Sequence, residues 1–185
     1  MEIDINQKKI SIGAKYQIFI DGQKTYRASA KLFRLLSEIN LFELDCGRPK
    51  YIIKKKLTFF KVAFDLTTWN NNVFEFRTKK IWKKSYYCQG GRDFYEIFGH
   101  RGRKFSVYKN NTQNAYWDKE AVAWFNGDNY KIIADNDSDY ELIILFCLII
   151  DNFFSKNNNG NTVTIDFGNI GPQDRKFDPT WQPKH

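Results

Sequence analysis

The sequence predicts a mainly β protein in which an antiparallel barrel of about twelve strands surrounds one hydrophobic helix near the C-terminus. The first observation is the stretch 139–154, whose central residues are apolar on every side when the stretch is drawn as a helix. The second is a series of about eleven or twelve short apolar segments before it, separated by turn signals at roughly the 8–12-residue spacing of antiparallel sandwiches and barrels. Strands therefore come first, and a helix that they must cover comes last.

The helix is expected to lie inside the protein. No residue from Leu142 to Ile150 is polar. Burying each large apolar side chain contributes roughly 1.5–3 kcal/mol, so exposing the whole run would cost more than the stability of a typical domain. Its sixteen residues reach only about 24 Å, whereas a membrane span needs about 20 apolar residues. Ser138 and Glu141 have the spacing of a capping box at its start, and the polar run 155–160 ends it.

The predicted strands all precede this helix. Alternation over 16–20, the turn Asp21-Gly22 and the segment 25–31 indicate an opening hairpin. Residues 31–38 fit either a strand or a short helical turn, and both remain open. The other strands are expected at 41–45, 51–60, 62–68, 74–79, 81–88, 94–98, 105–108, 115–117, and in a last hairpin of 121–125 with 130–134.

A sheet with one apolar face and a helix with no polar face can cover each other. A closed barrel of about twelve strands has a lumen too wide for side chains alone to fill, and a helix about 10 Å across would fill it. The alternative is an open sheet or sandwich with the helix packed between layers. Periodicity alone does not separate the two.

Four stretches resemble a known family: 16–32, 94–110, 121–137 and the closing segment 135–154, DNDSDYELIILFCLIIDNFF. They are similar, in pattern and in order, to the LURP-one-related proteins, which belong with the phospholipid scramblases in the tubby C-terminal-like superfamily. The resemblance implies a twelve-stranded antiparallel barrel at 1–155 around a central helix at 139–154, with 156–185 as a C-terminal extension. The chain has no scramblase-like proline-rich segment before the domain and no EF-hand-like loop, which weakens the transfer of scrambling activity and of calcium control.

Cysteine usage points to a reduced, cytoplasmic setting. The three cysteines, Cys46, Cys88 and Cys147, are scattered and form no CxxC motif, which favours neither a disulfide framework nor a zinc site. The N-terminal isoleucines are separated by polar residues, so no signal peptide is expected.

No enzyme signature is present, and neither a cofactor nor a metal is expected. His100 lies in a Gly-His-Arg-Gly turn, where a solvated histidine is the simpler interpretation than a catalytic one, and His185 is the last residue. Four carboxylates before and at the start of the helix could suggest calcium, but capping of the helix dipole explains them more simply: Asp135, Asp137, Asp139 and Glu141.

Charge is the stronger functional clue. The net charge is +8, and two stretches, 47–64 and 76–92, each hold six basic residues and no acidic one. A third cluster lies at 101–104. Solvated outer faces and lysines that protect strand edges explain part of this excess. The functional alternative is an anion-binding surface with ten candidate residues: Lys54, Lys55, Lys56, Lys79, Lys80, Lys83, Lys84, Arg101, Arg103 and Lys104.

Three functions are compatible with this pattern. The first is a cytoplasmic, non-enzymatic binding module that docks on an anionic membrane surface, with phosphoinositide head groups as the ligand class that the tubby-like resemblance implies. The second is a binder of single-stranded nucleic acid or another polyanion, because aromatic residues interleave with the basic ones: Tyr51, Phe59, Phe60, Trp82, Tyr86 and Tyr87. The third is scramblase-like lipid transfer with the helix released into the bilayer, which the short helix and Asp151 disfavour.

The tail after residue 156 is expected to be separate from the barrel. Residues 162–167 could form a strand that is added to an edge or to a protein partner. Residues 172–185 contain three prolines and resemble an extended arm, which either lies on the barrel through Phe177 and Trp181 or is disordered.

Overall fold

The computed structural model describes residues 1–10, 13–32, 37–56, 63–80, 83–119, 129–155 and 173–184. These form twelve strands, one short 3-10 turn, η2 (Arg101–Arg103), and one helix, α1 (Tyr140–Ser155). The strands are β1 (Glu2–Ile10), β2 (Gly13–Ile20), β3 (Gln23–Leu32), β4 (Ser37–Glu43), β5 (Tyr51–Lys56), β6 (Ala63–Thr68), β7 (Val73–Lys80), β8 (Ser85–Gly90), β9 (Asp93–Gly99), β10 (Phe105–Lys109), β11 (Thr112–Asp118) and β12 (Asn129–Ala134).

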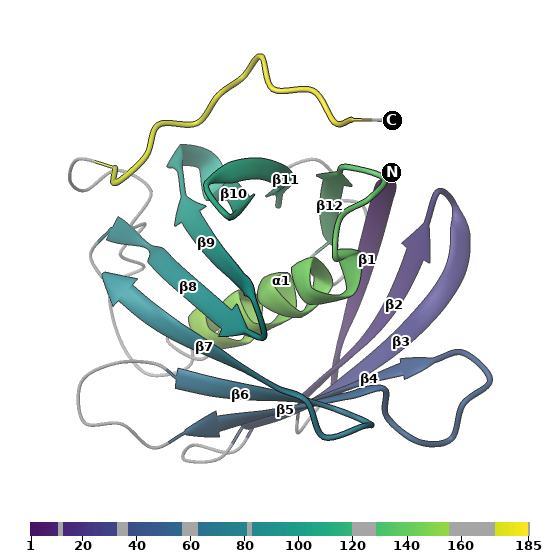
Figure 1. Cartoon of the computed structure of the whole chain (residues 1–185). Helices are drawn as coiled ribbons and strands as arrows, with labels where there is room; N and C mark the ends of the chain where they lie inside the picture. The colour runs from purple at the N-terminus through teal and green to yellow at the C-terminus, as the bar shows by residue number, and fades with distance from the viewer. Residues whose placement is uncertain are drawn as a thin grey trace, which may run out of the picture.

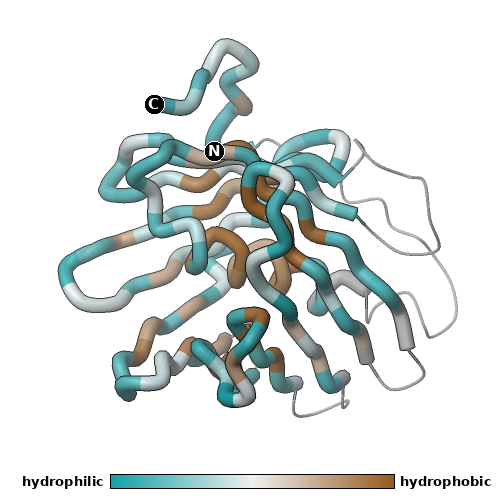
Figure 2. Tube along the Cα trace, turned by 90° about the vertical axis from the view of Figure 1, so that its right-hand side faces the viewer, coloured by the Kyte–Doolittle hydropathy of each residue, from teal (hydrophilic) through white to brown (hydrophobic). Residues whose placement is uncertain are grey.

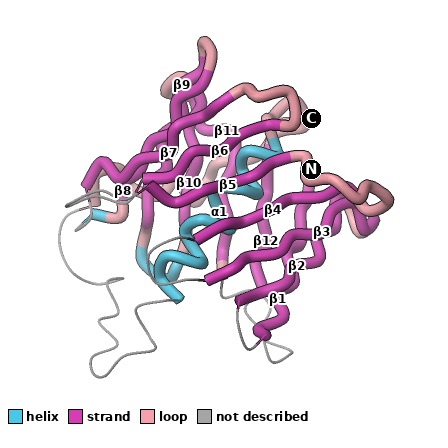
Figure 3. The backbone as a smooth tube through the Cα atoms, turned by 90° about the horizontal axis from the view of Figure 1, so that it is seen from below, coloured by secondary structure: helices cyan, strands magenta, loops and turns pink. Residues whose placement is uncertain are grey.

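The strands form one closed antiparallel barrel in chain order. Each strand pairs with its neighbours along the chain, and β1 pairs with β12 to close the sheet. The open sheet and the sandwich are therefore excluded, and the predicted barrel is confirmed. Figures 1 and 3 show α1 running through the barrel, with strands around it.

The helix forms the centre of the core, as its sequence requires. Every side chain from Leu142 to Ile150 is at most 4% exposed. Phe146 lies in the middle, with ring centroids 5.8 Å from Phe76 on β7 and 5.6 Å from Tyr95 on β9. Figure 2 shows the hydrophobic residues of the helix inside the barrel, while hydrophilic residues dominate the turns. Inward strand positions complete the same apolar cluster.

Several strand boundaries differ from the sequence predictions. The strand β1 was not predicted, although it closes the barrel. Its alternation Ile3, Ile5, Gln7 is interrupted by a polar residue that is nevertheless buried. The predicted strand 81–88 starts only at Ser85 among the described residues, because Lys84 has a positive φ of 47° and belongs to a turn.

Some predictions fall on parts of the chain that the structure does not describe. Residues 57–60 of the predicted strand 51–60 and the strand 121–125 lie outside the described residues, as does the tail strand 162–167. For residues 31–38, β3 continues to Leu32 and β4 begins at Ser37, and residues 33–36 are not described.

The two rims of the barrel are defined by the two ends of α1. The helix-start rim carries the ends of β2, β4, β6, β8, β10 and β12. The helix-end rim carries the ends of β1, β3, β5, β7, β9 and β11. In Figure 1 the helix ends on the left, where β5 and β7 also end. Residues 173–184, here called the arm, run along the outside over β9 to β12 (Figure 1).

Candidate functional site: a basic sector on the helix-end rim

Strand register brings the three predicted basic clusters to one rim. Lys56 at the end of β5 is level with Ala63, and Ala63 is level with Arg77 near the end of β7. Lys80 is level with Ser85, Ser85 with Phe98, and the next residue, Gly99, with Phe105. The hairpins β5–β6, β7–β8 and β9–β10 are therefore consecutive on the helix-end rim. We call their ten candidate cations the basic sector.

The first cluster is partly neutralised. Lys56 Nζ lies 2.7 Å from Asp65 Oδ2 on β6 and 3.9 Å from Glu75 Oε1 on β7. Lys54 is exposed and Lys55 is half-buried, and neither makes an ion pair with any residue that the structure describes. This cluster therefore contributes unneutralised charge through Lys54 and Lys55.

The second cluster is joined to the third through the backbone. The Gly99 N–H donates to the Lys84 carbonyl at 2.8 Å, so the β7–β8 turn lies against the end of β9. A Cβ on Gly99 would lie 2.5 Å from the Lys84 Cβ, which explains the glycine. Lys79 Nζ pairs with Glu96 Oε1 at 2.9 Å. Lys80 and Lys83 both reach Asp174 of the arm.

The third cluster forms the turn between β9 and β10. Gly102 and Arg103 have positive φ values of 70° and 61°, so the chain reverses sharply there. Arg101 and Arg103 are exposed and pair with no acid among the described residues. Lys104 Nζ lies 3.2 Å from Asp118 Oδ2 on β11 and 5.7 Å from the ring centroid of Phe177 in the arm.

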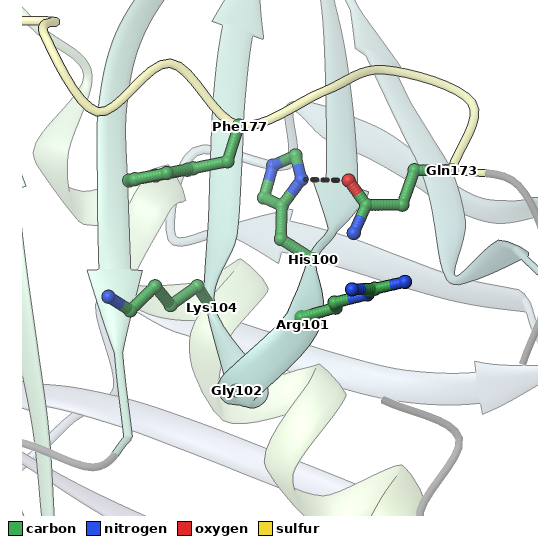
Figure 4. Close-up of a pocket in the computed structure, with 6 residues that line it drawn as sticks. All are labelled: His100, Arg101, Gly102, Lys104, Gln173 and Phe177. Carbon is green, nitrogen blue, oxygen red and sulfur yellow. Dashed lines mark hydrogen bonds between the residues drawn. The ribbon is translucent and has the colours of Figure 1, made fainter. Parts of the chain in front are cut away.

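A shallow cleft of about 370 Å³ lies between this turn and the arm. Figure 4 shows His100 at its centre, between Phe177 and Gln173 of the arm, with the side chains of Lys104 and Arg101 pointing to opposite sides. The cleft therefore has an aromatic wall and two flanking cations.

His100 is not the solvated turn residue that the sequence suggested. Its side chain is buried, because the arm covers it: the ring centroid lies 5.3 Å from that of Phe177, and Nδ1 is 3.5 Å from Gln173 Oε1. Burial lowers the pKa of His100 below its ordinary value, although the contact with Gln173 acts in the opposite direction. A sequence reading could not find this, because the covering residues are more than 70 positions away.

The Nε2 atom of His100 lies 2.7 Å from Ser106 Oγ. This contact was missed, because the two residues meet across the β9–β10 hairpin. Ser106 is fully buried, and the other ring nitrogen faces the amide of Gln173 rather than a carboxylate. Since a nucleophilic serine must be reachable by substrate, this pair is a structural cross-strand contact.

The aromatic residues expected to interleave with the cations do not form an exposed stacking surface where they are described. Tyr86 faces the core and stacks on Phe76, with centroids 5.5 Å apart, and Tyr87 stacks on Phe94. Tyr51 is half-buried on the helix-start rim. The other three, Phe59, Phe60 and Trp82, lie outside the described residues.

Beneath the helix-end rim, the last turn of α1 is fixed by a buried carboxylate. Asp151 accepts hydrogen bonds from the Tyr16 hydroxyl at 2.8 Å, from Gln7 Nε2 at 2.9 Å and from the Tyr130 hydroxyl. Lys119 Nζ lies 3.7 Å from it. Burial, followed by the charge of Asp151, raises the pKa of Tyr16, so its hydroxyl stays a donor.

At the helix-start rim, Glu141 is held by the barrel wall. Lys50 Nζ lies 2.7 Å from Glu141 Oε1 and 2.6 Å from Glu43 Oε1, and the Tyr26 hydroxyl donates to Glu141. Burial would lower the pKa of Lys50, but these two carboxylates outweigh it and raise the pKa.

Asp139 is held in the same way. Lys109 Nζ lies 2.7 Å from Asp139 Oδ2 and 3.1 Å from Asp93 Oδ2, and the Tyr95 hydroxyl donates to Asp139. The start of the helix is thus tied to β3, β9, β10 and the loop between β4 and β5.

These contacts correct the prediction of a capping box at the start of the helix. The Ser138 hydroxyl is buried and has no hydrogen-bond partner among the described residues, so the predicted capping box does not form. Glu141 pairs with Lys50 instead, since a charged partner and a phenol compete for its carboxylate. Asp135 accepts a hydrogen bond from the Lys184 backbone at 2.6 Å. In the described part of the chain, no three metal-ligating side chains gather as a metal site would require.

Cys46, Cys88 and Cys147 carry free thiols, and burial raises the pKa of Cys147 well above its ordinary value. None of the described helices has the length and hydropathy needed to span a bilayer.

The comparison with family models agrees with the fold. A family model described as LURP-one-related matches residues 1–151, which covers the whole barrel and most of α1. Neither the curated proteins nor the solved structures gave a match. Since the model spans well over half of the chain, this protein belongs to the LURP-one-related family.

Proposed function

We propose that this protein is a non-enzymatic binding module that docks on anionic phospholipid, including phosphoinositide head groups, through the basic sector. The observation that carries the proposal is the register that places three basic hairpins side by side on one rim. Each Lys or Arg close to an anionic membrane contributes about 1 kcal/mol, so several together give useful affinity. A cytoplasmic protein at the membrane periphery is the setting that this function requires.

The alternatives receive less support. Stacking of single-stranded nucleic acid needs exposed aromatic faces, and the described candidates Tyr86 and Tyr87 pack against other rings. Release of the helix into a bilayer would break the contacts of Glu141 and Asp151 and would empty the barrel core. Binding of a protein partner through the tail remains a proposal for residues beyond the barrel.

Vesicle sedimentation with matched variants tests the proposal. The double variant Arg101→Gln, Arg103→Gln removes two exposed charges from the basic sector. The control Lys24→Gln, Arg48→Gln removes two exposed charges from the helix-start rim. On phosphatidylcholine vesicles that contain phosphatidylserine, we expect the first variant to bind about thirtyfold more weakly than wild type and the control to bind within about twofold of it. Equal losses, or equal wild-type binding to neutral vesicles, would refute the function.

A further inference from the structure

One carboxylate of the arm lies between two lysines of the basic sector. Asp174 Oδ1 is 3.0 Å from Lys80 Nζ and 2.9 Å from Lys83 Nζ. Only about a tenth of the Asp174 side chain is exposed, whereas Lys80 is half-exposed. Two ammonium groups thus converge on a single carboxylate oxygen. An anionic oxygen of another ligand could be bound by the same two groups.

The charges at this point are not balanced. Two lysines face one carboxylate, so the pair keeps a net positive charge. Burial would raise the pKa of Asp174, but the hydrogen bonds from Lys83 and Lys80 outweigh it and hold that pKa below its ordinary value. A phosphate group would satisfy both lysines better than a carboxylate, because it offers more acceptor oxygens, and a phosphomonoester on a phosphoinositide head group also carries more charge.

The rest of the arm is fastened independently of Asp174. Phe177 packs edge-on against Tyr116 at 5.7 Å, and Trp181 packs on the same ring at 5.8 Å. The Trp181 indole N–H donates to the Gln113 carbonyl at 3.3 Å. Residues 177–184 can therefore keep the arm on the barrel while the lysine pair exchanges its anion.

The residue next to Asp174, Arg175, is also anchored, by cation–π contacts and by a hydrogen bond to Asn111 Oδ1 at 3.1 Å. The Arg175 guanidinium lies 3.7 Å from the ring centroid of Tyr108 and 5.8 Å from that of Phe98. Both rings are outside the barrel core and are only 6% exposed. The arm thus covers an aromatic strip on the outer wall, and full detachment would expose that strip to water. Local displacement of Asp174 is the less costly change.

We infer that Lys80 and Lys83 form a phosphate subsite for a phospholipid head group, which Asp174 occupies from within the chain and must leave when the membrane binds. This inference rests on the proposed function. It adds that the Asp174 carboxylate competes with the lipid phosphate for Lys80 and Lys83. The arm lowers the resting affinity for anionic surfaces, so that only a sufficiently anionic membrane displaces its carboxylate.

The arm offers a matched pair of variants. Asp174→Ala removes the carboxylate from the lysine pair. Asp178→Ala removes an equal charge four residues away, from a side chain whose hydrogen bonds to described residues stay within the arm, at Thr180. Both are made in the full chain, and thermal melts establish that each remains folded. Binding is measured on phosphatidylcholine vesicles with and without phosphatidylserine.

We expect Asp174→Ala to bind the phosphatidylserine vesicles about 25-fold more tightly than wild type, because it frees two lysines and each adds roughly fivefold, and Asp178→Ala to stay within about twofold. Equal affinities for the two variants would overturn the inference, and they would leave the proposed function intact if the Arg101, Arg103 variant still loses binding. If no variant distinguishes anionic from neutral vesicles, the proposed function itself fails.

Hydrogen exchange of residues 173–178 provides the second measurement. We expect exchange to increase when wild-type protein binds phosphatidylserine vesicles and to stay unchanged in inorganic phosphate. An equal increase with inorganic phosphate alone would overturn the lipid assignment and would indicate a site for free phosphate. Unchanged exchange on vesicles that do bind would show that Asp174 is not displaced.

Discussion

The two rims of the barrel have opposite charge arrangements. At the helix-start rim, one lysine is shared by two carboxylates, as Lys50 is by Glu43 and Glu141. At the helix-end rim, one carboxylate is shared by two lysines, Lys80 and Lys83. The first arrangement leaves Lys50 no free charge for an external ligand, and the second leaves positive charge in excess at Lys80 and Lys83. The comparison teaches that one rim fastens the helix, whereas the other can attract an anion.

The helix-end rim also holds the helix in place, but the contacts that do so lie in the interior of the barrel. Asp151 is surrounded by Gln7, Tyr16 and Tyr130, and it is separate from the cations outside. Fastening and binding therefore use different faces of the same strands. This separation allows each to be broken without the other.

The largest effect is expected from Asp151→Ala. The substitution leaves three buried donors without their acceptor and Lys119 without its carboxylate, so the free energy of unfolding should fall by about 3–5 kcal/mol. Urea unfolding followed by circular dichroism measures this loss. Asp137→Ala, which removes an exposed carboxylate before the helix, serves as the control and should cost less than about 0.5 kcal/mol. A similar small loss for both would show that the network does not hold the helix.

The apolar run from Leu142 to Ile150 was sufficient to predict a helix covered by strands, whereas the choice of a closed barrel over a sandwich came from the family resemblance. The three basic clusters were likewise visible as local runs of charge, and antiparallel hairpins were expected around them. Whether those hairpins would meet on one rim depended on strand order and register, which the local pattern did not contain.

The rest depended on contacts between distant residues. Asp174 and Lys80 are 94 positions apart, and His100 is covered by Phe177 from the arm. A local sequence pattern does not indicate contacts between residues so far apart, so His100 was predicted to be solvent-exposed. For β1, the missing signal was local: a buried Gln7 interrupts its apolar alternation, and its reason is the contact with Asp151, 144 positions later.

Single lysine substitutions on the two rims should have smaller effects, and these should distinguish the roles of the rims in stability and in vesicle binding. Lys50→Met and Lys83→Met each replace one cation by a neutral side chain of similar length. Lys50→Met leaves two carboxylates unpaired, so the free energy of unfolding should fall by about 1–2 kcal/mol with little change in binding to phosphatidylserine vesicles. Lys83→Met should change stability by less than about 0.5 kcal/mol and weaken vesicle binding about fivefold.

Urea unfolding and vesicle sedimentation are both run on both variants, so that each serves as the other's control. The division of roles between the rims would be wrong if Lys50→Met weakened vesicle binding as much as Lys83→Met. It would also be wrong if Lys83→Met destabilised the fold as much as Lys50→Met.

The smallest effect concerns pH and the buried histidine beside the basic sector. The folded pKa of His100 lies below its ordinary value of 6.5, because burial disfavours the imidazolium and outweighs the opposite effect of the contact with Gln173. Above pH 6.5 both the folded and the unfolded chain hold it neutral, so its contribution to stability is constant. As the pH falls below 6.5, His100 becomes protonated in the unfolded chain while it is still neutral in the folded chain. The free energy of unfolding therefore decreases.

One proton gives a slope of at most about 1.4 kcal/mol per pH unit, and only in the window between the two pKa values. The variant His100→Gln removes this proton while other acidic groups titrate unchanged, so the difference between the wild-type and variant unfolding curves isolates it. We expect the difference in the free energy of unfolding to be constant above pH 6.5. Below pH 6.5, the wild type should lose stability relative to the variant. Since Gln173 and Phe177 pack on His100, hydrogen exchange of the arm should rise over the same range. A difference that is flat across the whole range would mean that His100 is as accessible to protons in the folded chain as in the unfolded one, and that the arm does not shield this end of the basic sector.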